Sequence, residues 1–321
     1  MARKKITERI DAITGIDGNR RIAAPPCPKS VKIELTARCN FKCSFCATAD
    51  KLRAKGDMDW DFYLKLLKEL RQSGVEEVGM FYLGESFLLP WLPDAIKAAK
   101  DAGIAYVFIT TNGSLAKPEM VKACMEAGLD SLKFSLNYAD GEQFSDIARV
   151  KASIYRDIID NVKSTAAIRD AGGPDGRPYD CGIYASYIKY DGEQGMRMKA
   201  IVAEVEPLLD QVYSLPLYSQ ADLVSVAEND KGWTISGGNP GRADNMRDPV
   251  PCWSLFTEAR VTYDGFLSAC CFDHDGRFRM GDLKSEPFMQ AWTSEKFQDL
   301  RRAHLSGDVR ETVCSACVSY G

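Results

Sequence analysis

The sequence predicts an α/β protein built on a parallel sheet, either open or closed into a full or partial barrel, with a small metal-binding region after it. Between residues 31 and 218, short β-rich runs alternate with helical segments, and alternating βα units give parallel sheets with right-handed crossovers. Beyond residue 218 the alternation stops, and the cysteines gather in two places. Chemistry is therefore expected at the carboxyl ends of the strands.

Six runs rich in β-branched and aromatic residues are predicted as strands. They cover residues 31–35, 75–83, 105–113, 130–137, 181–190 and 210–218. Helices are predicted between them, at residues 60–74, 92–103, 117–128 and 156–173. In the first of these helices, Leu64, Leu67 and Leu70 recur at helical spacing, and Gly74 marks a plausible end.

The chain divides into four regions on this pattern. Residues 1–30 form an N-terminal extension, and residues 31–218 form the α/β body. Residues 219–251 are rich in Gly, Asn, Asp and Pro and are predicted as a linker or long surface loop. Residues 252–321 are too few for an extensive core and carry five of the eleven cysteines, so a metal site would compensate for the small core.

Composition and charge narrow the class of protein. The net charge of −4 shows no basic excess, which argues against a nucleic-acid partner. The N-terminus lacks the apolar segment of a secretory signal, and no stretch of about 18 apolar residues could span a membrane. We therefore expect a cytoplasmic protein without a membrane partner. In a reducing compartment, eleven cysteines point to metal binding or catalysis rather than to disulfides.

Three cysteines stand on the loop that follows the first predicted strand. Cys39, Cys43 and Cys46 are spaced C-x3-C-x2-C. A structural zinc normally takes four protein ligands, and neither His274 nor His304 is close to this loop in sequence. Three thiolates can hold a [4Fe–4S] cluster whose fourth iron stays open to an exogenous ligand. Zinc or inert buried thiols are the alternatives.

With this spacing at this position, the sequence resembles the radical S-adenosylmethionine (SAM) superfamily over roughly residues 31–218. The resemblance implies a partial (β/α)6 barrel, similar to a TIM barrel, and a [4Fe–4S] cluster on which SAM occupies the open iron. It also implies reductive cleavage of SAM to a 5′-deoxyadenosyl radical, which abstracts a hydrogen atom from the substrate. A flavodoxin- or ferredoxin-type protein would supply the electron.

Further motifs sit where that family contacts SAM. The stretch "YLGES" resembles the family's glycine-glycine-glutamate-proline motif after the second strand, although Leu83 and Ser86 depart from it. "TTNG" ends the third strand and "FSLN" the fourth, and an aromatic residue stands between the last two loop cysteines. Each short motif alone is also common as a turn or a helix cap. The resemblance implies SAM contacts at Phe45, Gly84, Glu85, Thr111, Asn112, Ser135 and Asn137.

The C-terminal region supplies a second set of thiols. The region begins with C-x17-C, has Gly265 five residues before the second cysteine of that pair, and ends with C-x2-C. Spacing alone allows a tetrahedral zinc or a fully ligated iron–sulfur cluster. The region resembles the auxiliary-cluster region called SPASM or, in its shortened form, Twitch, which implies a second [4Fe–4S] cluster. The implied ligands are Cys252, Cys270, Cys314 and Cys317.

Cys271, next to one of these ligands, is either a small buried residue, an alternative ligand, or a thiol that returns a hydrogen atom to a substrate radical. An auxiliary cluster suits oxidation of the substrate, and the spacing resembles Twitch enzymes that dehydrogenate a sugar or aminocyclitol. Epimerisation of such a substrate is the companion hypothesis. Modification of a ribosomally made peptide, as by SPASM-type maturases, is the alternative reaction. An inactive iron–sulfur or zinc scaffold is the non-enzyme alternative.

Overall fold

Six parallel strands, the first five each followed by a helical return, form the body of the main sheet, as the alternation predicts. The computed structural model describes residues 5–50, 52–224, 235–236 and 240–317. The six strands pair in chain order, each parallel to the next. They are β1 (Ser30–Ile33), β2 (Glu77–Gly79), β3 (Tyr106–Thr111), β4 (Ser131–Ser135), β5 (Gly182–Ile188) and β6 (Gln211–Leu215).

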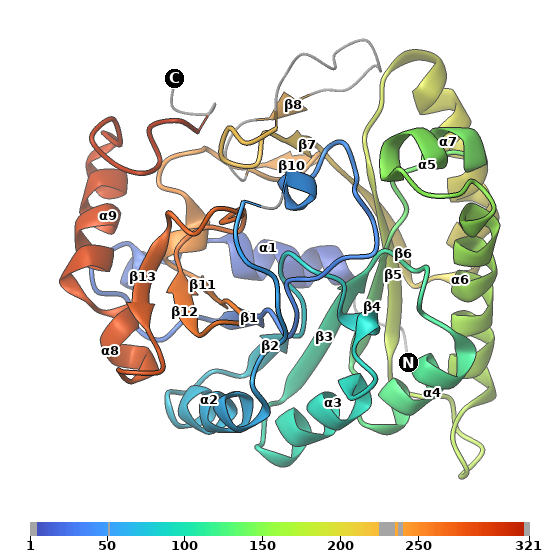
Figure 1. The fold of residues 1–321 in the computed structure, drawn as a ribbon, viewed down its shortest axis with the longest axis horizontal. Coiled ribbons are helices and arrows are strands. Elements are labelled where there is room, and N and C mark those ends of the chain that lie inside the picture. The colour runs from blue at the N-terminus through green and yellow to red at the C-terminus, as the bar shows by residue number, and fades with distance from the viewer. Residues whose placement is uncertain (1–4, 51, 225–234, 237–239, 318–321) are drawn as a thin grey trace.

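Helices cover the outer face of this sheet. Figure 1 shows them wrapping the outside of the curved sheet from α2 round to α7. None of the helices in the described ranges has the length and apolar character needed to cross a membrane. The outer helices are α2 (Trp60–Gln72), α3 (Leu92–Asp101), α4 (Pro118–Glu126), α5 (Gly141–Ala148), α6 (Ile154–Ala171) and α7 (Gly192–Val205).

Helix α2 illustrates how the sequence sets these elements. The Asp59 side chain accepts a hydrogen bond of 2.9 Å from the backbone N–H of Phe62 and so caps the helix start. The buried face of α2 differs from the predicted one at one position: Leu67 and Leu70 are buried, but the Leu64 side chain is 41% exposed. The buried face consists of Phe62, Tyr63, Leu66, Leu67 and Leu70.

The C-terminal region continues the main sheet. Strand β11 (Glu258–Val261) pairs in parallel with β1, with Val31 opposite Ala259, and β12 (Phe266–Ser268) and β13 (Arg279–Asp282) follow in antiparallel order. In the described residues the sheet therefore has nine strands. Two helices, α8 (Phe288–Trp292) and α9 (Glu295–Ser306), close this side. Strand β1 thus has a partner on both sides and is not an exposed edge.

The N-terminal extension contains a helix that the sequence pattern did not predict. Helix α1 (Ile6–Thr14) crosses the inside of the sheet. Its Thr7 hydroxyl lies 3.2 Å from the side-chain oxygen of Gln211, the first residue of β6, and Arg9 pairs at 2.5 Å with Glu77, the first residue of β2. Helix α1 therefore covers the amino ends of the strands, opposite the three-cysteine loop.

The predicted sixth strand is split in the structure. Strand β6 ends at Leu215, and β7 (Leu217–Tyr218) pairs instead with β8 (Ile235–Ser236). Pro216 stands at the break because proline has no N–H to donate to a ladder. Within the predicted linker, β9 (Gly241–Arg242) and β10 (Asn245–Met246) also pair. The remainder of that prediction, at residues 225–234 and 237–239, lies outside the described residues.

Candidate cluster and substrate site

The three-cysteine loop lies at the carboxyl end of β1 and is fastened to its surroundings by backbone hydrogen bonds. The N–H of Lys42 donates to the carbonyl of Ala148 at 3.1 Å, and the N–H of Ser44 donates to Ile147 at 2.9 Å, so the loop rests on α5. The Phe41 ring packs edge-on against a ring of the same helix, with centroids 5.4 Å apart. The loop is therefore held in place by contacts outside the three thiols.

Burial acts on all three thiols. It raises the pKa of Cys39 to about 11 and of Cys43 to about 12, and it also raises the pKa of Cys46. The thiols lie close enough for their charges to act on one another, which raises the pKa of Cys43 further. Iron binding removes these protons, because the thiolate is the ligand.

The donor set around these sulfur atoms fits a thiolate-bound cluster. The N–H of Phe41 bonds to the Cys39 sulfur, and the Thr48 backbone and hydroxyl bond to the Cys46 sulfur. Hydrogen bonds to cluster sulfurs are a usual means of tuning such centres. Among the described residues, no three Cys, His, Asp or Glu side chains converge closely enough to hold a single metal ion.

Tyr138 completes this set, and the sequence analysis did not single it out. Its hydroxyl lies 3.1 Å from the Cys43 sulfur, and its ring stacks with Phe45 at a centroid distance of 6.4 Å. Tyr138 directly follows Asn137, the last residue of the "FSLN" motif, so its place in the sequence was the available signal.

Gln220, from the predicted linker, also holds the loop. Its side-chain amide donates to the carbonyl of Phe45 at 2.7 Å and accepts from the N–H of Ala47 at 3.1 Å. Gln220 adopts a left-handed backbone conformation, with φ of 52°. No sequence motif marks this residue, because its role depends on the approach of the segment after β7.

Gly84 makes the closest backbone approach at this site. A Cβ atom at Gly84 would lie 2.1 Å from the carbonyl oxygen of Thr36 and 2.7 Å from that of Arg38. Real Cβ atoms do not come this close to backbone, so only glycine fits here. The next residue, Glu85, donates its N–H to the Arg38 carbonyl at 2.8 Å. The "YLGES" segment therefore lies directly against the start of the three-cysteine loop.

Glu85 joins the ends of two strands. Its buried carboxylate accepts hydrogen bonds from the Thr111 hydroxyl at 2.9 Å and from the Asn112 N–H at 2.8 Å. Burial raises the pKa of Glu85, and these donors oppose that shift. The Asn112 amide in turn donates to Asn40, on the three-cysteine loop, at 2.9 Å. The structure thus brings these predicted residues to one rim, with the Glu85 side chain already occupied by internal donors.

The C-terminal thiols converge on one cavity, which we call the thiol cavity. Residues that the sequence separates by as many as 65 positions meet there because α8 and α9 fold the chain back past the β11–β12 hairpin. The N–H of Cys252 donates to Nδ1 of His304 at 3.1 Å, and burial lowers the pKa of that imidazole to about 4. The cysteines that line this cavity are Cys252, Cys270, Cys271, Cys314 and Cys317. Five thiols on one cavity fit a fully ligated cluster.

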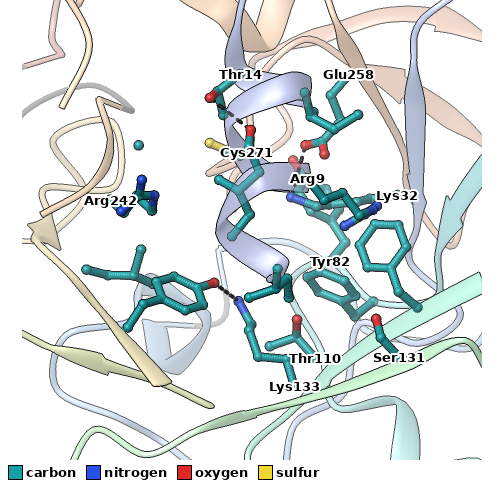
Figure 2. A pocket seen from close by; sticks show the side chains of 18 of the residues that line it. Arg9, Thr14, Lys32, Tyr82, Thr110, Ser131, Lys133, Arg242, Glu258 and Cys271 are labelled. Atoms are coloured by element: carbon teal, nitrogen blue, oxygen red, sulfur yellow. Dashed lines mark hydrogen bonds and ion pairs between the residues drawn. The ribbon is translucent and has the colours of Figure 1, made fainter. Parts of the chain in front are cut away.

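A separate cavity, of about 300 Å³, occupies the inside of the sheet. Its floor is α1, and residues of β1, β3, β4, β6 and β11 contribute to its wall. In β4 and β6 these are alternate residues, which point inward because side chains alternate along a strand. Figure 2 shows Lys32, Thr110, Ser131 and Lys133 directed into it. We call this space the central cavity. Its size falls in the usual range for small-molecule sites.

Cys271 lies in the wall between the central cavity and the thiol cavity, and it lines both, as does Phe272. Burial raises the pKa of Cys271, but its hydrogen bond with Cys270 and the charges of Arg260 and Lys32 outweigh burial, and the net pKa is lowered. Sequence reasoning left three interpretations of Cys271, as a small buried residue, an alternative ligand or a hydrogen-atom donor, and its position beside a cavity of suitable size is compatible with the third.

Two further contacts connect the cavities. The Tyr82 hydroxyl donates a hydrogen bond to the carbonyl of Cys270, and Tyr82 also lines the central cavity. Buried Glu258 pairs with both Lys32, at 2.9 Å, and Arg260. Lys32 and Glu258 come from strands more than 200 residues apart, so sequence reasoning did not pair them, whereas Glu258 and Arg260 lie two residues apart on β11.

Three features together define the class of this protein. They are the parallel barrel-like sheet, the C-x3-C-x2-C loop on the carboxyl end of its first strand, and the thiol cavity of the C-terminal region. This combination is that of radical SAM enzymes with an auxiliary iron–sulfur region. Family comparisons agree. A model described as the Radical SAM superfamily matches residues 33–176, and one described as the SPASM iron–sulfur cluster-binding domain matches residues 252–318.

Curated relatives place the chain in this family. A probable GTP 3′,8-cyclase of Methanococcus maripaludis is 31% identical over 261 residues, which cover 77% of this chain and 86% of that protein. The chain therefore belongs to the radical SAM superfamily. A tungsten-containing aldehyde ferredoxin oxidoreductase cofactor-modifying protein of Pyrococcus furiosus is 35% identical over 112 residues, 34% of this chain. That match spans about a third of the relative's length, 31%.

Solved structures share the fold at low sequence identity. BtrN in complex with AdoMet and 2-DOIA superposes with a TM-score of 0.60 at 16% identity, over 90% of this chain and 92% of that one. SuiB of Streptococcus suis bound to its precursor peptide SuiA gives a TM-score of 0.62 at 14% identity, over 92% and 71%. These likenesses confirm the fold class. The two matched domains together imply SAM and two [4Fe–4S] clusters as the cofactors.

Proposed function

We propose that this radical SAM enzyme dehydrogenates a small polar molecule held in the central cavity. One observation carries the proposal: Cys271 and Phe272 line both the central cavity and the cavity of the C-terminal thiols. A substrate between the strand ends and this wall would lie next to both cofactor sites. When bound, SAM and its cluster supply the radical that abstracts a substrate hydrogen atom, and the auxiliary cluster supplies an electron acceptor.

Specific residues would hold these groups. Cys39, Cys43 and Cys46 would bind the first cluster, because they are the three half-buried thiols of the loop at the carboxyl end of β1. Four of the five thiols that line the thiol cavity would bind the auxiliary cluster, and the resemblance to Twitch-type regions implies Cys252, Cys270, Cys314 and Cys317. The SAM contacts would come from the rim that Glu85 and Tyr138 organise. The chain's own task is orientation and exclusion of water.

The substrate class is the finer part of the proposal. A sugar or aminocyclitol suits a cavity of about 300 Å³ lined by hydroxyl, ammonium and guanidinium groups. BtrN, whose structure contains 2-DOIA, supports a small molecule. Relatives named GTP 3′,8-cyclase support a nucleotide as a further candidate. SuiB, bound to a precursor peptide, supports the peptide alternative. We also place the protein in the reducing cytoplasm, with a flavodoxin- or ferredoxin-type electron donor.

Epimerisation is the second candidate, and the position of Cys271 favours it. A thiol beside the substrate could return a hydrogen atom to the carbon radical from the face opposite the abstraction. The reaction would balance, because the substrate loses one hydrogen atom to the 5′-deoxyadenosyl radical and gains another from the thiol. The Cys271 thiyl radical left by this transfer would take one electron from the flavodoxin- or ferredoxin-type donor and one proton from solvent, which restores the thiol for the next turnover.

Incubation of the loaded, reduced enzyme with SAM and each substrate class tests the proposal. Dehydrogenation predicts a product lighter by two hydrogens, together with transfer of deuterium from a labelled substrate to 5′-deoxyadenosine. A product whose mass is unchanged in H2O, and which carries one deuterium when the reaction is run in D2O, would select epimerisation. The Cys271→Ala variant should not form this product. Absence of any 5′-deoxyadenosine with both clusters verified would support an inactive scaffold and contradict the proposal.

A further inference from the structure

The cations of the central cavity differ in whether they have a carboxylate partner. Arg9 pairs with Glu77 at 2.5 Å, and Lys32 pairs with Glu258 at 2.9 Å. Arg242, which enters the cavity opposite them in Figure 2, pairs with a carboxylate of α1 at 2.9 Å. Each of these pairs joins two elements of the cavity wall, so a structural role accounts for their charges.

Lys133 stands apart from the others. It is the third residue of β4 and points into the central cavity. Among the described residues, no carboxylate lies within ion-pair distance of its ammonium. Its hydrogen-bond partner is the buried hydroxyl of Tyr213, at 3.2 Å. A lysine ammonium has three donors, so two remain after this contact.

The surroundings add to this unbalanced charge. Glu258 is shared between Lys32 and Arg260, so one carboxylate faces two cations in the same wall. Positive charge therefore exceeds negative charge around the cavity. A cation in a partly enclosed space, away from an opposite charge, gains most from an anion that replaces its lost hydration.

The geometry of Lys133 and Tyr213 suits an oxyanion. When the Tyr213 hydroxyl accepts from Lys133, its own proton is free to donate, so the two side chains present an ammonium and a hydroxyl donor side by side. Hydrogen bonds from charged donors to an oxyanion are the stronger kind. Lys133 lies two residues, or about 7 Å of strand, from Ser135 at the rim.

We propose that Lys133 and Tyr213 form a subsite for an anionic group, a phosphate or a carboxylate, of the substrate. This inference rests on the proposed function, since it takes the central cavity as the substrate site. The anionic group lies low in the cavity, toward α1, and the rest of the molecule extends toward the rim where the predicted SAM contacts gather. This subsite narrows the proposed substrate class to small polar molecules with an acidic group, and it disfavours the neutral sugar and the aminocyclitol considered above.

Calorimetric titration of the oxidised, SAM-bound holoenzyme with inorganic phosphate, and separately with acetate, tests this subsite. Wild type and Lys97→Met, a control with the same change on the exposed face of α3, should bind at least one of the two probes equally. Lys133→Met should weaken that binding about tenfold or more, which corresponds to about 1.4 kcal/mol. The probe that binds distinguishes a phosphate group from a carboxylate.

Tyr213→Phe gives a second variant should Lys133→Met fail to fold, because it keeps the buried ring and removes only the hydroxyl. It should also weaken the probe's binding. Equal binding by wild type and the folded subsite variants, or no binding of either probe to wild type, would overturn the proposal. No reductant is present, so the result does not depend on SAM cleavage, and failure of the proposed reaction would be seen separately.

Discussion

At the residue scale, the site depends on a close approach of backbone at Gly84 that leaves no room for a side chain. Gly84 lies against the carbonyls of Thr36 and Arg38, at the point where the chain enters the three-cysteine loop. Glu85 then fixes the end of β3 through Thr111 and Asn112. One close approach thereby positions two strand ends and the loop that carries the predicted cluster ligands.

Replacement of Gly84 by alanine tests this arrangement. The new Cβ would lie 2.1 Å from a backbone oxygen, so the segment must move, and we expect a loss of about 3 kcal/mol of unfolding free energy. Gly18→Ala is the matched control, since nothing lies within 4 Å of its added Cβ. Denaturant unfolding of the cluster-free protein measures both, and equilibrium dialysis of the loaded protein should show impaired SAM binding only in Gly84→Ala. Equal stability and SAM binding in the two variants would contradict the arrangement.

The sequence indicated some of these residues and concealed others. The spacing of the three loop cysteines pointed to a cluster because it is local. The contact of Tyr138 with the Cys43 sulfur and the proposed role of Lys133 both depend on tertiary structure, that is, on which way a side chain faces and on what lies across the barrel. A lysine in the middle of a buried strand was the available signal for Lys133. Gln220 left no signal, because the approach of its segment is a tertiary event.

At the scale of elements, α1 closes the central cavity from below, and polar contacts hold it there. Asp11 on α1 receives two hydrogen bonds from the Arg242 guanidinium, at 3.2 and 2.9 Å. The hydrogen bond from Arg242 lowers the pKa of Asp11. The helix was missed although Ile6, Ile10 and Ile13, which line the cavity, recur at helical spacing, because the charged and polar residues between them resemble an ordinary surface segment.

A double-mutant cycle on Asp11→Ala and Arg242→Ala measures this attachment. We expect a coupling of about 1 kcal/mol at neutral pH, because the pair is bidentate but only partly screened from water. Since the folded-state pKa of Asp11 is lowered, the coupling should be present above the ordinary carboxyl pKa and fade as pH falls through the lowered value.

The exposed pair Lys97–Asp101, with side chains 65% and 63% exposed, provides the control cycle. Its coupling should be smaller than that of Asp11 and Arg242, because water screens both charges. Equal coupling in the two cycles would show that the contact between α1 and β9 does not hold the floor of the cavity.

At the scale of the whole molecule, the two thiol regions belong to one continuous sheet. The six alternating strands could be predicted because each βα unit is local. The parallel pairing of β11 with β1 could not, because it joins segments more than 200 residues apart. That pairing places the thiol cavity beside the central cavity, with Cys271 in the wall that the two cavities share. The proposal that SAM is cleaved at the three-cysteine loop while the C-terminal thiols hold the electron acceptor rests on this placement.

The central claim is that the three-cysteine loop starts the chemistry while the C-terminal thiols hold a separate cluster. Formation of 5′-deoxyadenosine by the reduced protein, scored against iron per chain, tests it most directly. Wild type should carry about eight irons and cleave SAM, whereas the combined Cys39→Ala, Cys43→Ala and Cys46→Ala variant should keep about four irons and form no 5′-deoxyadenosine. A triple variant that still cleaves SAM, or that loses all of its iron while remaining folded, would contradict the claim.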